Sequence, residues 1–337
     1  MSGLRYLSGR EVAVACADLD PVAVVAEALA HHAAGDSKLP DEAYLAWQTQ
    51  RGEAARLLAM PGLVDGNGFV GVKVLGANPG NPARGLARAA GLTVLFDRAG
   101  ARPVCAMEAA TISAMRTAAV SALAAQLLAG PPVERMAVVG AGALAAAHLD
   151  VLPAALPALA EVRLHDIAPG RAQALGMSFE RRLQRRGARL RIAHTAERAI
   201  RGAELVVAVT TATEGYIELG WLAPGAVVVN VSLDDVLPEV VLGVELVVVD
   251  DWHVVRTDRR RLLGRMARDG LVTGPDTEGG PVHAQIGDLL IGRRPGRQAD
   301  HDRILVNPFG LAIEDVALAV RVHAAARRLG LGTSLER

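Results

Sequence analysis

A glycine-rich string in the middle of the chain has the residue types and spacing of a dinucleotide-binding turn. From Val138 to Ala145 the sequence fits a strand, then G-x-G-x-x-A, then a helix. The first glycine of this pattern permits a tight turn, the second lets the backbone approach a pyrophosphate, and the final alanine allows close helix–strand packing. The helix would direct unpaired N–H groups at the phosphates. We therefore expect a cofactor site made by Gly140, Ala141, Gly142, Ala143 and Leu144.

Polar residues follow two of the neighbouring β-rich runs. Asp166 follows Val162–Leu164, where a carboxylate accepts hydrogen bonds from the ribose hydroxyls of NAD and repels the 2′-phosphate of NADP. Arg171 lies close enough to leave NADP as the alternative. Thr210 and Thr211 follow the apolar run that ends at Val209, and the carboxyl ends of parallel strands are where a cofactor binds. Helix capping would also explain both threonines.

Three charged positions could bind or transform an acidic substrate. Lys73 lies in an apolar strand, where its ammonium either points to solvent from an edge strand or meets an anion. Arg116 lies among small apolar residues of a helix, which suits bidentate carboxylate recognition or an ordinary ion pair. Asp234 and Asp235 follow a strand at the edge where α/β sites form, and capping of the following turn would account for one of them.

The elements that must position these residues change in type along the chain. Glu11 to about Ala33 is predicted to be one helix, with a possible break or restart at Asp20-Pro21. Short apolar runs separated by turn residues predict an antiparallel sheet from about Tyr44 to Leu95. A helix is predicted from Thr111 to Ala129. Continuous apolar strands alternating with helices then indicate a parallel sheet, before a last helix at 312–329.

Bulk composition excludes several classes of protein. The 337 residues are 51% hydrophobic, and 36 basic residues balance 36 acidic ones. This length suits two domains, and the lack of a basic excess argues against nucleic-acid binding. Two cysteines, Cys16 and Cys105, provide neither a disulfide framework nor a paired-cysteine metal site. No apolar stretch is long enough to span a bilayer, so we expect a cytoplasmic protein without metal or membrane partners.

Several ordered motifs together resemble the ornithine cyclodeaminase/mu-crystallin family, from about Met60 to Gly330. They are Gly71-Val72-Lys73, Asn78-Pro79-Gly80-Asn81, Arg116-Thr117-Ala118-Ala119, Gly140-Ala141-Gly142, Asn230 with Asp235, and Pro308-Phe309-Gly310. The resemblance implies an α/β fold in which a Rossmann-type doubly wound parallel sheet is inserted into an α+β substrate-binding and dimerisation domain. The expected domains are 1–120 plus 311–337, and 121–310.

The resemblance also implies chemistry. Members of this family use a nicotinamide cofactor to interconvert amines and imines of amino acids, usually as homodimers. By position, Lys73 and Arg116 would hold the substrate carboxylate, and Asp235 would serve the amine or the attacking water, which makes Lys73 and Asp235 the expected catalytic pair. Arg116, Thr117 and Ser232 would lie near the cofactor, which we expect to be NAD.

Departures from the usual family pattern point to an acidic substrate. The usual Gly-Leu-Pro-Thr is Gly85-Leu86-Ala87-Arg88 here, and the arginine that cyclodeaminases place after the first helix has no clear match. Arg88 adds a cation, which predicts extra substrate carboxylates. The strings Arg88-Ala89, Asn230-Val231-Ser232-Leu233 and Pro238-Glu239 are similar to one branch, the N-(2-amino-2-carboxyethyl)-L-glutamate dehydrogenases.

That branch makes 2,3-diaminopropionate for siderophores and peptide antibiotics from a substrate with three carboxylates. The resemblance implies NAD-dependent oxidation of N-(2-amino-2-carboxyethyl)-L-glutamate to an imine, with hydrolysis to L-2,3-diaminopropionate and 2-oxoglutarate. Three alternatives stay open. They are an ornithine or lysine cyclodeaminase, a simple imine reductase or alanine-type dehydrogenase, and a mu-crystallin-like protein that binds a ligand without turnover.

Overall fold

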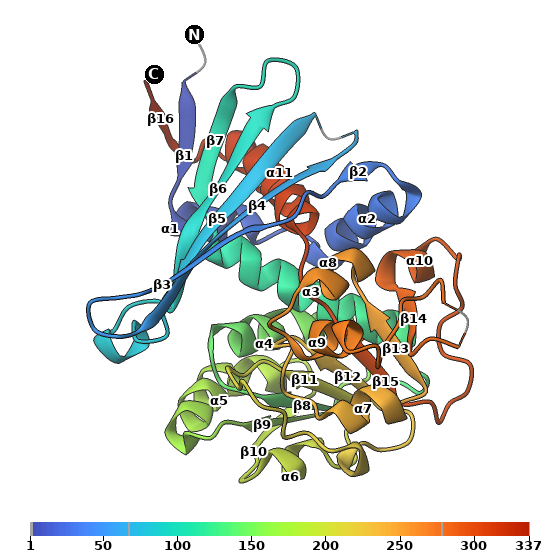
Figure 1. The fold of residues 1–337 in the computed structure, drawn as a ribbon. Coiled ribbons are helices and arrows are strands. Elements are labelled where there is room, and N and C mark those ends of the chain that lie inside the picture. The colour runs from blue at the N-terminus through green and yellow to red at the C-terminus, as the bar shows by residue number, and fades with distance from the viewer. Residues whose placement is uncertain (1–2, 67, 278, 337) are drawn as a thin grey trace. The chain divides into compact units, whose positions relative to one another are not determined.

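The chain divides into two compact units, each with its own sheet (Figure 1). The computed structural model describes residues 3–66, 68–277 and 279–336. Unit 1 comprises Met1–Arg116 and Leu311–Arg337, and unit 2 comprises Thr117–Gly310. Helix α3 (Ala110–Leu128) contains the boundary between them. An all-parallel α/β unit is thus inserted in the sequence of an α+β unit, which confirms the predicted fold class.

Unit 1 is built on an eight-stranded, mainly antiparallel sheet. Its order is β16-β1-β7-β6-β5-β4-β2, with β3 also pairing with β4, and only β1 and β7 run parallel. This confirms the antiparallel pattern predicted between Tyr44 and Leu95. The strands are β1 (Leu4–Leu7), β2 (Ser37–Lys38), β3 (Ala43–Gln48), β4 (Ala54–Val64), β5 (Phe69–Ala77), β6 (Ala89–Asp97), β7 (Pro103–Glu108) and β16 (Thr333–Leu335). A 3-10 turn, η1 (Pro82–Arg84), separates β5 from β6.

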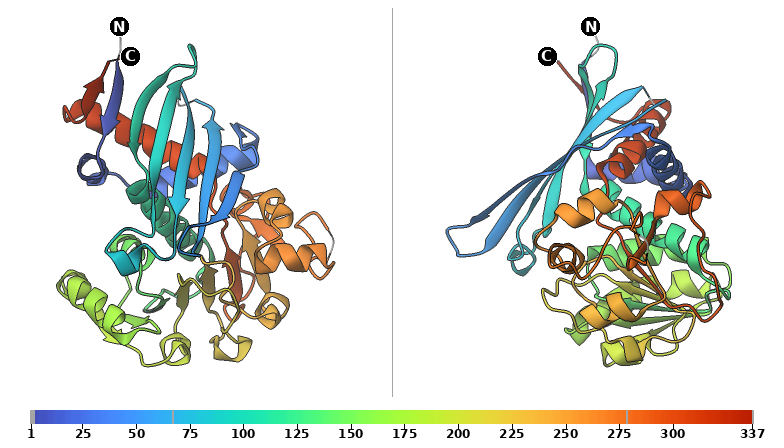
Figure 2. Two further views of the ribbon diagram at one scale, coloured as in Figure 1. Left: turned by 60° about the vertical axis from the view of Figure 1, so that its left-hand side comes forward. Right: turned by 45° about the vertical axis from the view of Figure 1, so that its right-hand side comes forward.

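Helix α11 (Ala312–Arg328) lies across one face of this sheet (Figure 2). A Cβ added to Gly71 of β5 would lie 2.7 Å from a methyl group of Val316, and one added to Gly62 of β4 would lie 3.1 Å from Ala312. Glycine at these positions therefore lets the helix approach the strands closely. Because side chains alternate along a strand, Lys73 points to the same face as Gly71.

The predicted N-terminal helix is two helices, α1 (Gly9–Cys16) and α2 (Pro21–Ala34). Asp20 is the N-cap of α2, where its side chain accepts hydrogen bonds from Val22 and Ala23 N–H. Pro21 occupies the first helical position, where its missing N–H costs nothing. The possible restart at Asp20-Pro21 is confirmed.

Unit 2 contains an eight-stranded sheet whose pairs are all parallel, in the order β10-β9-β8-β11-β12-β15-β13-β14. Its strands are β8 (Arg135–Val139), β9 (Glu161–His165), β10 (Arg189–Ile192), β11 (Leu205–Ala208), β12 (Val227–Asn230), β13 (Leu246–Val249), β14 (Val282–Gln285) and β15 (Ile304–Asn307). The chain passes from β8 to β9 on one side and later to β11 on the other. The carboxyl ends of β8 and β11 therefore form a topological switch point, where ligands bind in open α/β sheets.

Helices of different lengths connect these strands: α4 (Ala143–Ala155), α5 (Pro169–Gln184), α6 (Ala196–Ile200), α7 (Pro238–Gly243), α8 (Trp252–Thr257), α9 (Leu262–Arg268), α10 (Ile286–Leu290) and the 3-10 helix η2 (Leu219–Trp221). A core cluster joins buried residues of α6, α7, α8 and α9 to side chains of the sheet. Fully buried valine-rich strands such as Val227–Asn230 fit a sheet that is shielded on both faces.

Helix α3 is long and apolar enough to cross a membrane by length and composition, but 61% of its apolar window is buried inside the protein. The predicted helix at 111–129 is confirmed within one residue at each end. Its second half is surrounded by protein, with Ala118, Ala122 and Ala125 all at 0% exposure. It is therefore a core helix rather than one with a broad solvent-facing side.

Candidate active site

The glycine-rich turn joins β8 to α4 at the switch point. Gly140 has φ +105°, and a Cβ there would lie 2.6 Å from the Val209 carbonyl oxygen, so only glycine fits. Gly142 is the N-cap of α4, and no described atom lies within 4 Å of where its Cβ would be. Open space therefore lies in front of a 13-residue helix whose first N–H groups need acceptors. This arrangement fits a pyrophosphate.

Asp166 lies beside this turn, directly after β9. Its Oδ2 accepts a hydrogen bond from Ala141 N at 2.8 Å, and its Oδ1 accepts one from Ala168 N at 2.8 Å. The carboxylate is thereby fixed next to the glycine turn, where the sequence predicted a partner for ribose hydroxyls. Gly142, Ala143 and Leu144 open α4 on the other side of the turn.

Asp235 is the centre of a buried hydrogen-bond network. Its side chain is 0% exposed, and its Oδ1 accepts hydrogen bonds from the hydroxyls of Thr210 and Tyr216, the latter at 2.8 Å. Among the described residues, Oδ2 has no hydrogen-bond partner. A buried carboxylate oxygen without a donor is unusual, because desolvation without compensation is costly. Burial, followed by the charge of Asp235, raises the pKa of Tyr216, so the tyrosine remains a hydrogen-bond donor.

The threonines after β11 do not cap a helix, since the next element is η2. Instead Thr210 N donates to Ser232 Oγ at 2.8 Å, and the Thr210 hydroxyl bonds to Asp235. Thr211 follows as an exposed residue. The helix-capping alternative was therefore wrong, and Thr210 and Ser232 connect the ends of two parallel strands.

Asp234 contacts a different part of unit 2 from Asp235. Its carboxylate accepts from Leu262 N at 2.8 Å, at the start of α9, and forms an ion pair with Arg261 at 2.9 Å. Arg265 adds a longer contact at 3.4 Å. The alternative that one of the two aspartates caps the following turn was therefore wrong, because Asp234 binds the start of a helix 28 residues away in sequence.

Lys73 and Arg116 meet acidic residues of α11 inside unit 1. Lys73 is 1% exposed, and its Nζ lies 2.6 Å from Oδ2 of Asp315 and 3.3 Å from the Ser113 hydroxyl. Arg116 lies 3.1 Å from Glu314 and 3.4 Å from Asp315. We call Lys73, Arg116, Glu314 and Asp315 the buried quartet. The edge-strand alternative for Lys73 was wrong, because β5 pairs on both sides and the ammonium meets an anion.

The buried quartet balances two cations against two carboxylates. Burial lowers the pKa of the Lys73 ammonium, and the charge of Asp315 opposes that effect. The ion-pair alternative for Arg116 is therefore what the structure contains, and substrate binding by Lys73 and Arg116 stays a prediction. Among the described residues, Asp315 Oδ1 has no hydrogen-bond partner.

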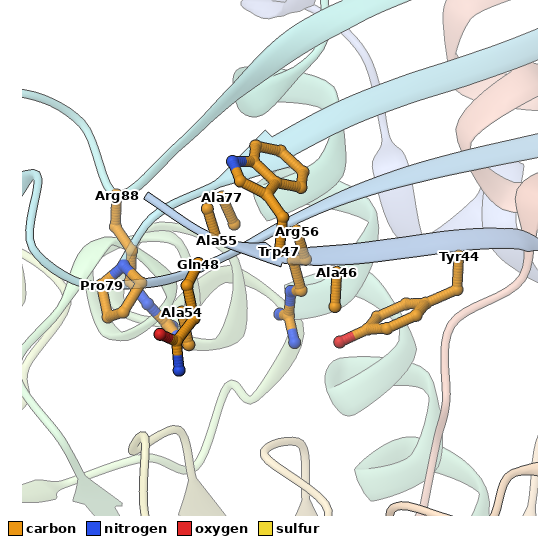
Figure 3. Close-up of a pocket in the computed structure, with 10 residues that line it drawn as sticks. All are labelled: Tyr44, Ala46, Trp47, Gln48, Ala54, Ala55, Arg56, Ala77, Pro79 and Arg88. Atoms are coloured by element: carbon orange, nitrogen blue, oxygen red, sulfur yellow. The ribbon is translucent and has the colours of Figure 1, made fainter. Parts of the chain in front are cut away.

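Arg88 lies in a pocket at the other end of the same sheet (Figure 3). The pocket has a volume of about 430 Å³, within the range of small-molecule sites. Figure 3 shows Tyr44, Gln48 and Arg56 projecting to one side of their strands and Trp47 to the other. The full lining is Tyr44, Ala46, Trp47, Gln48, Ala54, Ala55, Arg56, Ala77, Pro79 and Arg88.

The sequence missed several residues of these clusters. Nothing in the sequence around Tyr216 distinguishes it from other loop residues. Glu314 and Asp315 could have been noticed as adjacent acids at the start of an apolar helix. No group of three or more histidine, cysteine or acidic side chains that could hold a metal was found among residues 3–66, 68–277 and 279–336. Asp251 caps α8 through Val254 N at 2.9 Å, and the adjacent Asp250 accepts from Gly310 N–H.

Comparisons with known proteins agree with this architecture. The model of the ornithine cyclodeaminase/mu-crystallin family matches residues 7–329. N-((2S)-2-amino-2-carboxyethyl)-L-glutamate dehydrogenase of Staphylococcus aureus is 33% identical over 93% of this chain and 92% of that protein. The crystal structure of CmnK superposes with a TM-score of 0.91 at 38% identity, covering 100% of this chain and 99% of CmnK.

A second similar structure is an archaeal alanine dehydrogenase dimer with bound NAD. It has a TM-score of 0.86 and 25% identity and covers 99% of each chain. The family model alone spans most of the sequence, and the curated relative extends over nearly the whole length of both proteins. The chain therefore belongs to the ornithine cyclodeaminase/mu-crystallin family and is an oxidoreductase.

Proposed function

We propose that the protein is a cytoplasmic, NAD-dependent dehydrogenase that oxidises N-(2-amino-2-carboxyethyl)-L-glutamate at the glutamate Cα–N bond. The resulting imine is hydrolysed to L-2,3-diaminopropionate and 2-oxoglutarate, for siderophore or peptide-antibiotic biosynthesis. The identity to the Staphylococcus aureus dehydrogenase supports this substrate. The structural observation that carries the chemistry is Asp235, whose carboxylate has two donors on one oxygen and none among the described residues on the other.

The cofactor fits the glycine turn of unit 2. The open space before Gly142 and the N-terminus of α4 suit its pyrophosphate, and Asp166 suits its ribose hydroxyls. We assign seven further residues to the same cofactor site: Gly140, Ala141, Ala143, Leu144, Thr210, Thr211 and Ser232. Arg116 and Thr117, the two residues between which the units divide, are also assigned to the cofactor. When bound, the nicotinamide ring accepts a hydride from the substrate Cα.

Asp235 moves the protons. Its Oδ2 takes the proton of the substrate amine as the C=N bond forms and returns this proton to the imine nitrogen, which regenerates the carboxylate. The carboxylate then takes a proton from the water that adds to the imine carbon. When the carbinolamine collapses to ketone and amine, Asp235 gives that proton to the departing nitrogen, takes the hydroxyl proton as the C=O bond forms, and releases it to solvent. Thr210 and Tyr216 hold Oδ1, which leaves Oδ2 as the base.

Lys73 and Arg116 bind the carboxylate beside the reacting carbon. Each cation is already oriented by Asp315 or Glu314, so little side-chain freedom is lost when a substrate joins the network. Arg88 serves a further carboxylate.

The test is turnover of N-(2-amino-2-carboxyethyl)-L-glutamate with NAD, followed at the NADH absorbance band and by mass of the products. Asp235→Asn should lower kcat by about a hundred- to ten-thousandfold while NAD binding is unchanged. Cyclisation of ornithine, with release of ammonia and no reaction of the triacid, would contradict the proposal.

A homodimer is the proposed assembly, formed by the face of the unit 1 sheet opposite α11. The strand register puts Leu45 and Leu57 side by side on this face, with Trp47 and Leu92 also on it. These four side chains are 37–61% exposed. A contiguous apolar face of this kind marks an interaction site, and the dimeric state of the archaeal relative favours a second copy as its partner. Trp47→Glu should shift the mass measured by light scattering from dimer to monomer.

A further inference from the structure

Two neighbouring parallel strands of unit 2 are apolar until their last residue, which is an asparagine in both. Strand β12 (VVVN) ends at Asn230 and strand β15 (ILVN) ends at Asn307, and every residue of both strands is buried. Val229 is paired with Val306 in the register, so the two asparagines lie side by side at the carboxyl edge of the sheet. Because asparagine is usually exposed, a buried pair requires hydrogen-bond partners for both amides.

A backbone N–H fixes the orientation of both amides. The Asp235 N–H donates to Asn230 Oδ1 at 3.4 Å, and a backbone N–H can only donate. The amide nitrogen of Asn230 must therefore face the other way, where Nδ2 donates to Asn307 Oδ1 at 2.9 Å. Since Oδ1 is the atom of Asn307 used in this pair, its Nδ2 is left as a donor. Among the described residues, that donor has no acceptor.

The unused donor of Asn307 accompanies the unused acceptor of Asp235. Asn307 is 2% exposed and Asp235 is 0% exposed, and the single amide of Asn230 contacts both residues. A buried polar atom without a partner is costly, so two such atoms around one amide indicate a ligand that offers an acceptor and a donor together. Water is the smallest molecule that offers both.

We propose that Asn307 positions the water molecule that hydrolyses the imine, by donating a hydrogen bond from Nδ2 to the water oxygen. The oxygen uses one lone pair for this bond and attacks the imine carbon with the other. One water proton passes to Asp235 Oδ2 as the C–O bond forms, and the π-electron pair of the C=N bond moves to the protonated nitrogen. This deepens the proposed function and rests on it for the base and for the hydrolytic step.

Single-turnover kinetics with NAD and N-(2-amino-2-carboxyethyl)-L-glutamate separate oxidation from hydrolysis, because NADH forms before water adds. Asn307→Ala removes the donor, and Asn307→Leu removes it at nearly constant side-chain volume. In both variants the rate of NADH formation should change less than about threefold, whereas the rate of 2-oxoglutarate formation should fall about ten- to a hundredfold. Gln298→Ala is the matched control, because Gln298 is an exposed amide of unit 2 that donates to the Gly296 carbonyl at 2.8 Å.

Equal falls in both rates, the result of a purely structural role, would overturn the proposal, and so would no fall in either rate.

A crystal structure of wild type with NAD is a second readout that needs no turnover. It should contain a water molecule within hydrogen-bond distance of Asn307 Nδ2 and Asp235 Oδ2, and Asn307→Leu should lack this water. A wild-type crystal without the water, or with Nδ2 donating to the protein or the cofactor, would refute the proposal even if the enzyme turns over the triacid. A wild type that holds the water but does not oxidise the triacid would contradict only the proposed substrate.

Discussion

The buried quartet and the pocket lined by Arg56 and Arg88 both contain cationic side chains of unit 1, yet they differ in the acidic residues around those cations. Lys73 and Arg116 are enclosed with Glu314 and Asp315, whereas Arg56 and Arg88 line an open pocket without an acidic lining residue. Burial explains the difference, because a buried cation without a counterion costs several kcal/mol while a hydrated one does not. The counterions of the buried quartet therefore orient its cations before a substrate binds, whereas solvent can reach the pocket arginines.

The largest effect should come from breaking the quartet. Asp315→Ala leaves Lys73 in its buried site without its 2.6 Å partner, and we expect a loss of about 3–5 kcal/mol in the free energy of unfolding. Urea titration measures it, with Asp65→Ala as an exposed ion-pair control that should change little. The double variant Lys73→Met/Asp315→Leu should recover most of the loss. Wild-type stability in Asp315→Ala would refute the distinction between quartet and pocket.

The buried histidine His148, whose hydrogen-bond partners are uncharged, gives a test of the same comparison through the pH dependence of stability. His148 accepts or donates only to neutral partners, the Leu144 carbonyl at 2.7 Å and the Ser121 hydroxyl at 2.8 Å, and burial lowers its pKa to about 4. The unfolded chain binds this proton near pH 6.5, so stability is fully present above pH 6.5 and falls as pH drops towards 4. The shift of the His148 pKa should lower the free energy of unfolding by about 3 kcal/mol between pH 7 and pH 4. Unfolding of wild type and His148→Gln between pH 7 and 4 measures it, and parallel curves would contradict the assignment.

Ionic strength should act on the pocket and spare the quartet. The Debye length is about 8 Å at 0.15 M salt, so open cations are screened and buried pairs are screened much less. We expect kcat/KM for the triacid to fall as salt rises in wild type and to fall less steeply in Arg56→Gln/Arg88→Gln. Identical slopes, measured from about 0.05 to 0.5 M salt, would remove electrostatic attraction from the role of the pocket.

The smallest effect is expected on the stability of the pocket variants. Arg56→Gln and Arg88→Gln should each change the free energy of unfolding by no more than about 0.5 kcal/mol, because side chains in an open pocket contribute little to the core. A loss comparable to that of Asp315→Ala would show that the pocket arginines are structural.

The sequence was informative where local pattern and burial agree. Continuous valine-rich runs predicted β8, β11, β12 and β13, but β10, with its alternating arginines, carried no comparable signal. Spacing indicated Asp234 and Asp235 equally, and only the family resemblance favoured Asp235. The glycine turn could be predicted because it follows a strand end. The partners of Lys73 could not, since Asp315 lies 242 residues away and two acids at a helix start equally suit a solvated dipole. Tyr216 and Arg56 likewise depend on tertiary contacts.

The loop from Ser232 to Asp235 is constrained in length as well as in residue type. Leu233 has φ +75°, and after this bend Asp234 anchors α9 while Asp235 joins Thr210 and Tyr216. Inserting or deleting one residue here would move both carboxylates by one position, so that one acid would take the place of the other and the second place would hold no acid. Homologues with a different spacing at this point should therefore have lost either the anchor or the base, even where both aspartates are retained.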